Sequence, residues 1–244
     1  MTLPRRRDDA SPAELMALAR GHADADRYEE ALAIWEPLAR GGNARACNNI
    51  GACFAEGMGV ARDAALAERW LTLSVQAGDP LGQRNLATLL FKGEGIEADH
   101  QRALGLYQAA AEQGDAIAQD MLSWMLLEDE ETAADPIEAR RWALRAAQQG
   151  VATSITRLGM LHHNALGVPR DPKAAVFWWG LAAARGEADG QAMLGAALVL
   201  GSGIDRDPMQ ALVWLLRAET AGSRLAGRFL PTARAALDDA QQQQ

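Results

Sequence analysis

A period of 36 residues runs through most of this chain and constrains its fold more than any other feature. Glycine recurs at that interval, and alanine recurs at the same interval in a second register. Such a period marks an array of one supersecondary motif, whose copies bury their apolar faces against their neighbours. The sequence therefore predicts a repeat protein. The recurring residues are Gly42, Gly78, Gly114, Gly150, Gly186 and Gly222, and Ala31, Ala67, Ala103, Ala139, Ala175 and Ala211.

Each of five repeats is predicted to hold a first helix (helix A), a long turn and a second helix (helix B). Helix A carries a leucine-type column and, beside it, a column of small residues that lets another helix approach closely. Helix B opens with an aspartate, which can accept hydrogen bonds from the free N–H groups of the first turn. These three columns are Ile50, Leu86, Leu122, Leu158 and Leu194; Gly51, Ala87, Ser123, Gly159 and Gly195; and Asp63, Asp99, Asp135, Asp171 and Asp207.

Helix B also carries an aromatic-rich column, which we expect to be core together with the alanines: Trp70, Leu106, Trp142, Trp178 and Trp214. Between the helices, glycines end helix A and allow positive φ in the turn. The fourth repeat keeps only Gly167 there, and the third has Asp129 and Glu131 instead. These glycines do not indicate a phosphate-binding loop, because no strand precedes them and no lysine stands at the required offset.

The flanks of the array are predicted as separate segments. Residues 1–10 are expected to be disordered, and residues 11–42 to form a tetratricopeptide-like helix pair that begins at the capping sequence Ser11-Pro12. Five repeats fill residues 43–222. A capping helix over 223–240 covers the end of the last repeat, with a break near Pro231, and residues 241–244 form a loose tail.

The columns, with the Gly-x-Gly turns and the terminal glycine of each repeat, resemble the Sel-1-like repeat family. The resemblance covers residues 43–222, and it implies an all-α, right-handed α/α superhelical solenoid. It also implies an adaptor, as in many bacterial members, that holds partner proteins on a concave surface lined by the A helices. The cysteine-rich members have a disulfide in each repeat, and this chain departs from them.

The charge and the hydrophobic pattern of the chain disfavour two classes of partner, nucleic acid and membrane. The formal net charge is −8 and the pI is near 5.1, which disfavours nucleic acid, since phosphate binding depends on Lys and Arg. No apolar run reaches the roughly 18 residues of a membrane helix, so we expect a cytoplasmic protein without a membrane partner.

Cys47 and Cys53 are six positions apart on one predicted helix, about 9 Å along its axis. A disulfide needs less than about 7 Å between Cα atoms, so we expect both thiols to be reduced.

Two clusters contain residue types that bind metals, but a role without a metal is favoured for each. His162 and His163 are adjacent, so on a helix they point about 100° apart and cannot share a metal well. His162 falls in a core column, where a histidine with satisfied hydrogen bonds is expected. The acidic run Glu128–Glu131 lacks the alternation and the glycine of an EF-hand loop, so a solvated loop is expected. No cofactor or metal is predicted.

The favoured function is a non-enzymatic adaptor that binds a protein or peptide. No nucleophile, base and orienting group stand in a recognisable arrangement, and no Glu-x-x-His or His-Glu motif occurs. Two alternatives stay open: a hydrolase-type enzyme of the Sel-1-like class, and a structural subunit that uses its end or convex face. The partner, the pathway and the oligomeric state are not predicted.

A stripe on helix A is the candidate binding groove. It takes offsets 3, 6, 10 and 13 after each repeat-terminal glycine, which share one helix face. Unlike the core columns, this stripe changes from repeat to repeat, and its aromatic, Met and Arg residues are typical of interface hot spots. The alternative is that these side chains pack between adjacent A helices. The candidate residues are Arg45, Asn48, Arg84, Thr88, Phe91, Trp124, Leu127, Met160 and His163.

The chemistry of this stripe suggests a ligand with two features. Guanidinium groups pair well with carboxylates, so an acidic or C-terminal carboxylate group is expected near Arg45 and Arg84. An apolar anchor is expected near Trp124.

Overall fold

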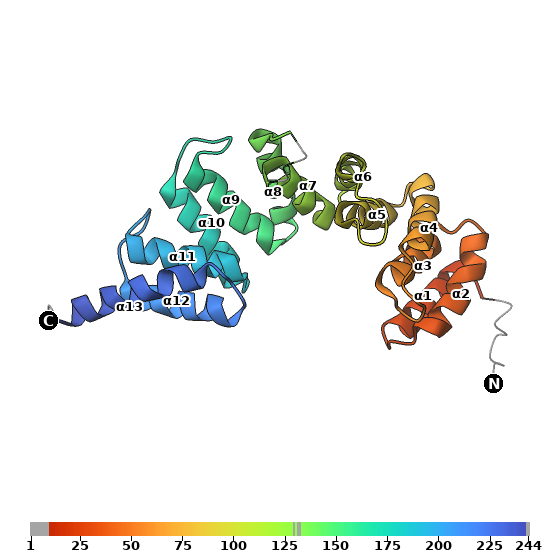
Figure 1. Cartoon of the computed structure of the whole chain (residues 1–244), viewed down its shortest axis with the longest axis horizontal. Helices are drawn as coiled ribbons and strands as arrows, with labels where there is room; N and C mark the ends of the chain where they lie inside the picture. Colours follow the sequence, from red (N-terminus) through yellow and green to blue (C-terminus); the bar gives the residue numbers. More distant parts are fainter. Residues whose placement is uncertain (1–9, 129, 131–132, 243–244) are drawn as a thin grey trace. The chain divides into compact units, whose positions relative to one another are not determined.

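The computed structural model describes residues 10–128, 130 and 133–242 (Figure 1). Within these residues the chain folds into thirteen helices and no strand, as predicted. The first pair is α1 (Pro12–Ala23) and α2 (Tyr28–Arg40). The A helices are α3 (Ala44–Glu56), α5 (Pro80–Lys92), α7 (Ala116–Glu128), α9 (Ala152–Asn164) and α11 (Ala188–Leu200). The B helices are α4 (Ala64–Gln76), α6 (His100–Glu112), α8 (Pro136–Gln148), α10 (Pro172–Ala184) and α12 (Pro208–Thr220), and α13 (Ala226–Gln242) ends the chain.

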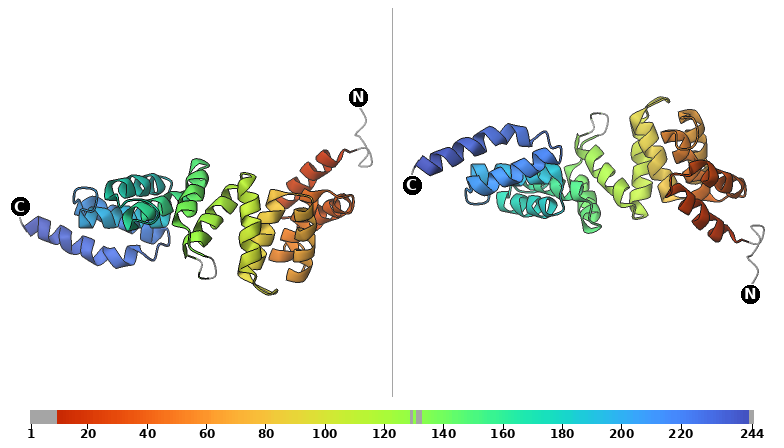
Figure 2. Two further views of the ribbon diagram at one scale, coloured as in Figure 1. Left: turned by 90° about the horizontal axis from the view of Figure 1, so that it is seen from above. Right: turned by 90° about the horizontal axis from the view of Figure 1, so that it is seen from below.

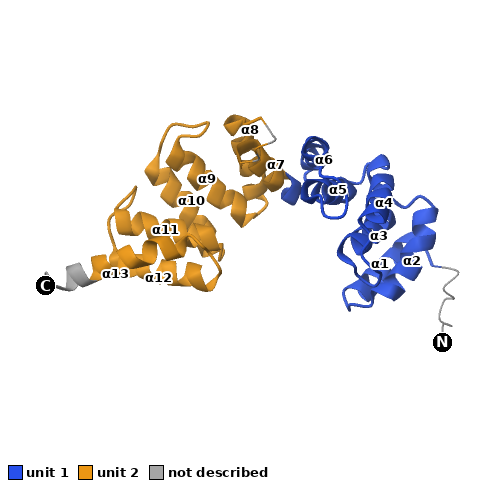
Figure 3. Cartoon of the chain, viewed as in Figure 1, with its two compact units in different colours: residues 1–118 blue, residues 119–244 orange. Residues whose placement is uncertain are grey.

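The helices fall into two compact units (Figure 3). Unit 1 covers residues 1–118 and holds α1 to α6 with the first residues of α7, and unit 2 covers residues 119–244 and holds the rest. Within each unit, helices that follow one another along the chain pack side by side, as α3 and α4 do in unit 1 and α11 and α12 in unit 2. Each unit is therefore a stack of helix pairs with its own core.

The alanine column and the leucine-type column form the cores, as predicted. All six alanines from Ala31 to Ala211 are fully buried, and the leucine-type residues from Ile50 to Leu194 are buried as well. Alanine suits this place because its single methyl group permits close contact between helix axes. The caps also agree with prediction, since each of the five aspartates that open the B helices accepts a backbone hydrogen bond from the first turn of its helix.

The prediction that the aromatic column is core holds for Trp142, which is buried, and is wrong for its other members. Trp70, Trp178 and Trp214 are only partly buried and pack at the edges of the cores. The next column points into the contact between helix A and helix B, and it is the one that is buried throughout: Leu71, Tyr107, Ala143, Trp179 and Leu215. At three of these positions the facing residue is a helix A glycine, at Gly51, Gly159 and Gly195. The small column therefore has the predicted role, with a different set of partners.

Four of the turns after the A helices begin with a residue in the left-handed conformation, which is glycine in three repeats and alanine in one. Gly57, Gly93 and Gly201 end α3, α5 and α11 in the left-handed region, with φ of 75°, 63° and 69°. The equivalent residue after α9 is Ala165, which has φ of 58°. A Cβ makes this conformation costly for alanine, so the fourth repeat holds its turn under strain. Asp129, in the third repeat, lies outside the described residues.

The C-terminal helix corrects the prediction of a break at Pro231. Helix α13 runs through Pro231 without interruption, and it packs against α11 and α12 (Figure 2). Proline removes one backbone donor, whose acceptor would be the carbonyl group four residues earlier. Pro231 itself is exposed, so water can satisfy that carbonyl, while Leu230 and Ala233 beside it are buried and hold the helix to unit 2.

Two cysteines lie in the core of unit 1, and a histidine lies at the edge of the core of unit 2. Cys47 and Cys53 are free, as expected, and both are buried in α3. His162 is half-buried, and its Nδ1 has no hydrogen-bond partner among the described residues. The expectation of a core histidine with satisfied hydrogen bonds is therefore wrong for this nitrogen.

Candidate partner-binding surface

The A helices of unit 2 form a pocket of about 290 Å³ at the predicted stripe. Its apolar lining residues are Trp124 on α7, Met160 on α9, Met193 on α11 and Leu225 in the turn before α13. Its polar lining residues are Glu128, Thr153, Thr156, Arg157, Glu187 and Asp189. Two residues predicted from the sequence, Trp124 and Met160, thus lie together in one pocket, and both side chains are half-buried.

The indole of Trp124 is fixed at one edge of this pocket. Its Nε1 donates to Oε2 of Glu128, one helical turn later, over 3.0 Å. An i,i+4 pair of this kind limits rotation of the ring. The structure therefore offers a half-buried, pre-oriented aromatic surface, which is the type of residue that dominates binding energy at protein interfaces.

A network of charges and hydroxyls joins the A helices under the pocket. Arg157 on α9 reaches Asp120 on α7, with Nη1 2.6 Å from Oδ1 and 3.2 Å from the backbone carbonyl of Asp120. The hydroxyls of Thr153 and Ser154 also donate to Asp120, and that of Thr156 donates to Glu187, which caps α11. These contacts connect each A helix to the next within unit 2 and hold the pocket walls in place.

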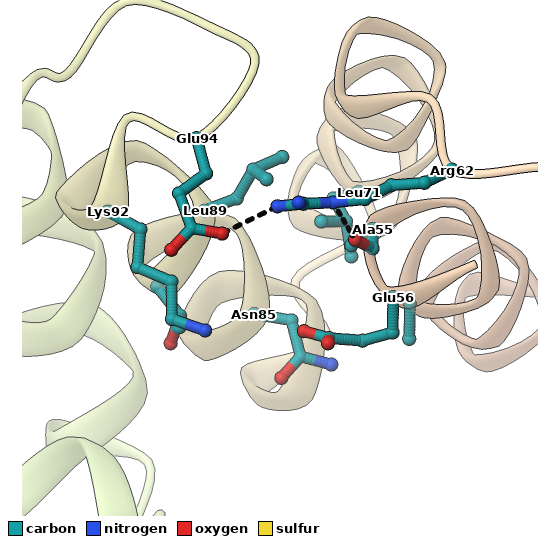
Figure 4. Close-up of a pocket in the computed structure, with 10 residues that line it drawn as sticks. Ala55, Glu56, Arg62, Leu71, Asn85, Leu89, Lys92 and Glu94 are labelled. Carbon is teal, nitrogen blue, oxygen red and sulfur yellow. Dashed lines mark hydrogen bonds and ion pairs between the residues drawn. The ribbon is translucent and has the colours of Figure 1, made fainter. Parts of the chain in front are cut away.

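Unit 1 has a smaller pocket of about 140 Å³ between α3 and α5 (Figure 4). Ala52, Ala55 and Thr88 of the predicted stripe contribute to its lining. Its rim carries an ion pair in which Arg62, in the turn after α3, reaches Glu94 over 2.6 Å and also donates to the carbonyl of Ala55 (Figure 4). Arg62 and Glu94 are thus already paired with each other, and the lining has no aromatic residue.

Three residues of the predicted set are engaged inside unit 1. Arg45 forms a bidentate ion pair with Asp79, with Nη2 2.7 Å from Oδ1 and Nε 3.1 Å from Oδ2. Nη1 of Arg84 lies 2.9 Å from Oδ2 of Asp115. Asn48 is buried and accepts a hydrogen bond from Asn85. Asn48 is therefore withdrawn from the candidate set. The two arginines already hold carboxylates of their own chain, which leaves little reason to expect a ligand carboxylate there.

The other candidates are half-buried and contact neighbouring helices. Thr88 bonds the hydroxyl of Tyr107, and the ring of Phe91 lies 4.7 Å from that of His100. Leu127 packs against the cluster of Ala143, Leu158 and Leu161, and His163 lies 5.4 Å from Trp179. All four are half-buried. These side chains thus pack mainly against B helices and not, as the alternative expected, between adjacent A helices, and Trp124 with Met160 is the pair that lies in a pocket.

Arg157, Met193, Glu187 and Leu225 were not predicted as site residues. Arg157 and Met193 each stand one position beyond a stripe offset, and the helix face turns enough for both positions to reach the pocket. Glu187 is the cap of α11, and Leu225 comes from the segment before α13. Of these four, only Arg157 and Met193 could have been predicted from the sequence, by including the positions next to each stripe offset.

No metal or membrane feature adds to this surface. Over the described residues, no three His, Cys, Asp or Glu side chains gather as a metal site would require. In the same part of the chain, no helix is both long enough and apolar enough to cross a bilayer.

Comparison with known proteins gives the family. The model of the Sel1 repeat matches five consecutive segments, residues 44–79, 80–115, 116–151, 152–187 and 188–223. The chain belongs to the Sel1 repeat family. The family's repeat boundaries fall at the short turns that follow the B helices, which is where the 36-residue period places them.

Solved structures of Sel1 repeat proteins have the same fold. A Sel1 repeat protein from Oxalobacter formigenes is 28% identical, with a TM-score of 0.84 over 88% of this chain and 86% of that one. The c5321 protein, a protective antigen of uropathogenic Escherichia coli, is 27% identical with a TM-score of 0.70, over 91% of this chain and 56% of that one. The immunity protein Pa5087 from Pseudomonas aeruginosa shares the fold alone, at 15% identity and a TM-score of 0.53 over 90% and 87%. No curated protein matches the chain.

Proposed function

We propose that this Sel1 repeat protein is a non-enzymatic scaffold, and that the pocket on the A helices of unit 2 holds a segment of a partner protein. Sel1 repeat proteins are generally protein-interaction scaffolds. The observation that carries the proposal is the pocket lined by Trp124, Met160, Met193 and Leu225. Repeat packing does not require large apolar residues at these places, since the stripe positions equivalent to Trp124 in the other repeats are Ala52, Thr88, Met160 and Ala196.

A catalytic role is a weaker alternative. The pocket has carboxylates and hydroxyls, but its lining includes no histidine, cysteine or lysine. Thr153 and Thr156 donate to carboxylates that have other structural partners, so neither hydroxyl has a base arranged to activate it as a nucleophile. We propose that the protein has no enzymatic activity and that it acts through binding.

The test is an affinity capture with the full chain, its Trp124→Ala variant and a matched control. Phe177 on α10 is 60% exposed and lies outside the pocket, so Phe177→Ala removes an aromatic side chain of unit 2 elsewhere on the surface. Captured proteins are identified by mass spectrometry. We expect a partner whose recovery is lost with Trp124→Ala and kept with Phe177→Ala.

The comparison requires that both variants fold. Thermal unfolding should place each within a few degrees of the original protein, because a half-buried side chain that lines a pocket contributes less to stability than a core residue. If Trp124→Ala retains every captured protein, or if it unfolds the chain, Trp124 is a packing residue and the proposed surface is wrong.

A further inference from the structure

The polar lining residues of the unit 2 pocket carry more negative than positive charge. Its acidic lining residues are Glu128, Glu187 and Asp189, and its one basic lining residue is Arg157. The guanidinium of Arg157 is already paired with Asp120 at 2.6 Å, and its side chain is only 11% exposed. Its charge is therefore offset inside the protein, and the three carboxylates dominate the field that a ligand would meet.

The groups that bond these carboxylates do not neutralise them. Glu128 accepts from the indole of Trp124, and Asp189 accepts from the hydroxyl of Ser223 over 2.6 Å. Glu187 accepts from the hydroxyl of Thr156 and from backbone N–H groups of α11. All of these donors are uncharged, so each carboxylate keeps its negative charge. Glu128 and Asp189 are also exposed, which leaves them accessible to a ligand.

The pocket between α3 and α5 in unit 1 is balanced in charge. Its lining has two acidic residues, Glu56 and Glu94, and two basic residues, Arg62 and Lys92. Arg62 and Glu94 form an ion pair with each other. The negative net charge of the chain therefore does not make every pocket acidic, although a second pocket of unit 1 is acidic as well, with Glu68, Glu97 and Asp99 against Arg102 and no aromatic residue in its lining.

We propose that the segment bound in the unit 2 pocket carries a lysine or arginine beside an apolar side chain. This inference rests on the proposed function and names its ligand chemistry. The apolar side chain occupies the space between Met160, Met193 and Leu225. The cationic group lies at the rim near Glu128 and Asp189. This chemistry is the opposite of the acidic ligand that the sequence suggested from Arg45 and Arg84.

Trp124 can contact both the apolar and the cationic part of the proposed ligand. Its Nε1 is bonded to Glu128, so the indole ring and a carboxylate are held together as one unit. A cation over the face of a tryptophan is attracted by the electrons of the ring, and a carboxylate nearby adds to that attraction. A lysine or arginine of the partner can therefore contact the ring and the carboxylate together, while its aliphatic stem covers apolar surface.

Selection from a phage-displayed library of random short peptides on the immobilised full chain tests this inference. Enriched peptides should combine Lys or Arg with a neighbouring Leu, Met or aromatic residue, and should fail to bind Trp124→Ala. Enriched peptides that need Trp124 but are neutral or acidic would overturn the cationic inference and leave the proposed function standing. Peptides that bind Trp124→Ala equally well, or no enrichment at all, would overturn both.

Fluorescence anisotropy with the most enriched peptide then tests the carboxylates. The double variant Glu128→Gln and Asp189→Asn keeps both acceptors and removes both charges, so it should weaken binding at low salt by about threefold for each charge. The difference should shrink at high salt, because salt screens exposed charges. Glu219→Gln, on the exposed surface of α12, is the matched control and should leave affinity unchanged. Equal affinity of the double variant and this control would contradict the inference.

Discussion

Gly159 on α9 faces the indole of Trp179 on α10 with no room for a side chain between them. A Cβ placed on Gly159 would lie 2.9 Å from Cε2 of Trp179 and closer still to its Nε1. Gly51 faces Leu71 and Gly195 faces Leu215 in the same way, with 2.7 Å from such a Cβ to the Cγ of each leucine. The large residue of helix B thus fills the space that the absent side chain of helix A leaves.

Gly159→Ala should therefore destabilise unit 2. The added methyl group forces Trp179, which is 2% exposed, out of its place, and overpacking of this kind costs about 1–3 kcal/mol. The control is Gly180→Ala in α10, where a Cβ would meet nothing within 4 Å. This control should be neutral or stabilising by up to about 1 kcal/mol, because alanine favours a helix over glycine. Urea unfolding monitored by circular dichroism compares them, and equal stabilities would contradict the assigned contact.

Ala165→Gly should stabilise the protein. Ala165 has φ of 58° at a position where three other repeats have glycine. Glycine removes the strain of that conformation, and the gain exceeds the added entropy of the unfolded chain by about 0.5–1 kcal/mol. Thermal unfolding measures the effect. A lower melting temperature for Ala165→Gly would show that the strain is absent.

Arg84→Ala should lower the free energy of unfolding. The side chains of Arg84 and Asp115 are 21% and 7% exposed in their ion pair, so removal of the arginine leaves a buried carboxylate without its cation. A loss of about 2 kcal/mol is expected. Arg62→Ala is the control, since Arg62 and Glu94 are both about half exposed, and such pairs contribute less than about 1 kcal/mol. Chemical denaturation at fixed salt should separate the two variants, and equal losses would contradict this account.

The buried thiols predict a loss of stability at alkaline pH. Burial raises the pKa of Cys53 from 9.0 to about 11, and it also raises the pKa of Cys47 and of the Tyr107 hydroxyl. The unfolded chain releases these protons first, so stability is complete below about pH 9 and falls as pH rises towards about 11, by on the order of 1 kcal/mol for Cys53.

Thiol labelling gives an independent measurement of the same property. At pH 8 the native protein should react slowly with a thiol reagent such as DTNB, because a protonated and buried thiol is a poor nucleophile. Both cysteines should react at once in denaturant. Fast labelling of the native protein, or denaturation curves that coincide at pH 8 and pH 10.5, would show that the thiols are accessible.

The repeat period made most of the fold predictable, and pair contacts between columns were the part that it missed. The small column was found because Gly51, Gly159 and Gly195 share a register. Its partners were not, because the buried column of helix B changes from leucine to tyrosine, alanine and tryptophan, while the column beside it looks more regular. The three large residues Leu71, Trp179 and Leu215 of the buried column each face a glycine of helix A.

The binding surface was predictable in part for a similar reason. Trp124 and Met160 stood out because nothing in the repeat requires large side chains there. Arg45 and Arg84 looked available because the sequence does not show that Asp79 and Asp115, at the start of the following A helices, lie within reach of them. The chain separation between the arginine and aspartate of each pair is close to one repeat, so the period could have indicated these partners.

Photo-crosslinking from Met160 tests the central claim most directly. A benzoylphenylalanine is introduced at position 160, in the unit 2 pocket, or at position 177 as the control, in cells that express the full chain. We predict a discrete crosslinked partner from position 160 that is absent from position 177 and is lost when Trp124→Ala is added. A partner crosslinked only from position 177, or one from position 160 that persists with Trp124→Ala, would contradict the claim that this pocket binds the partner.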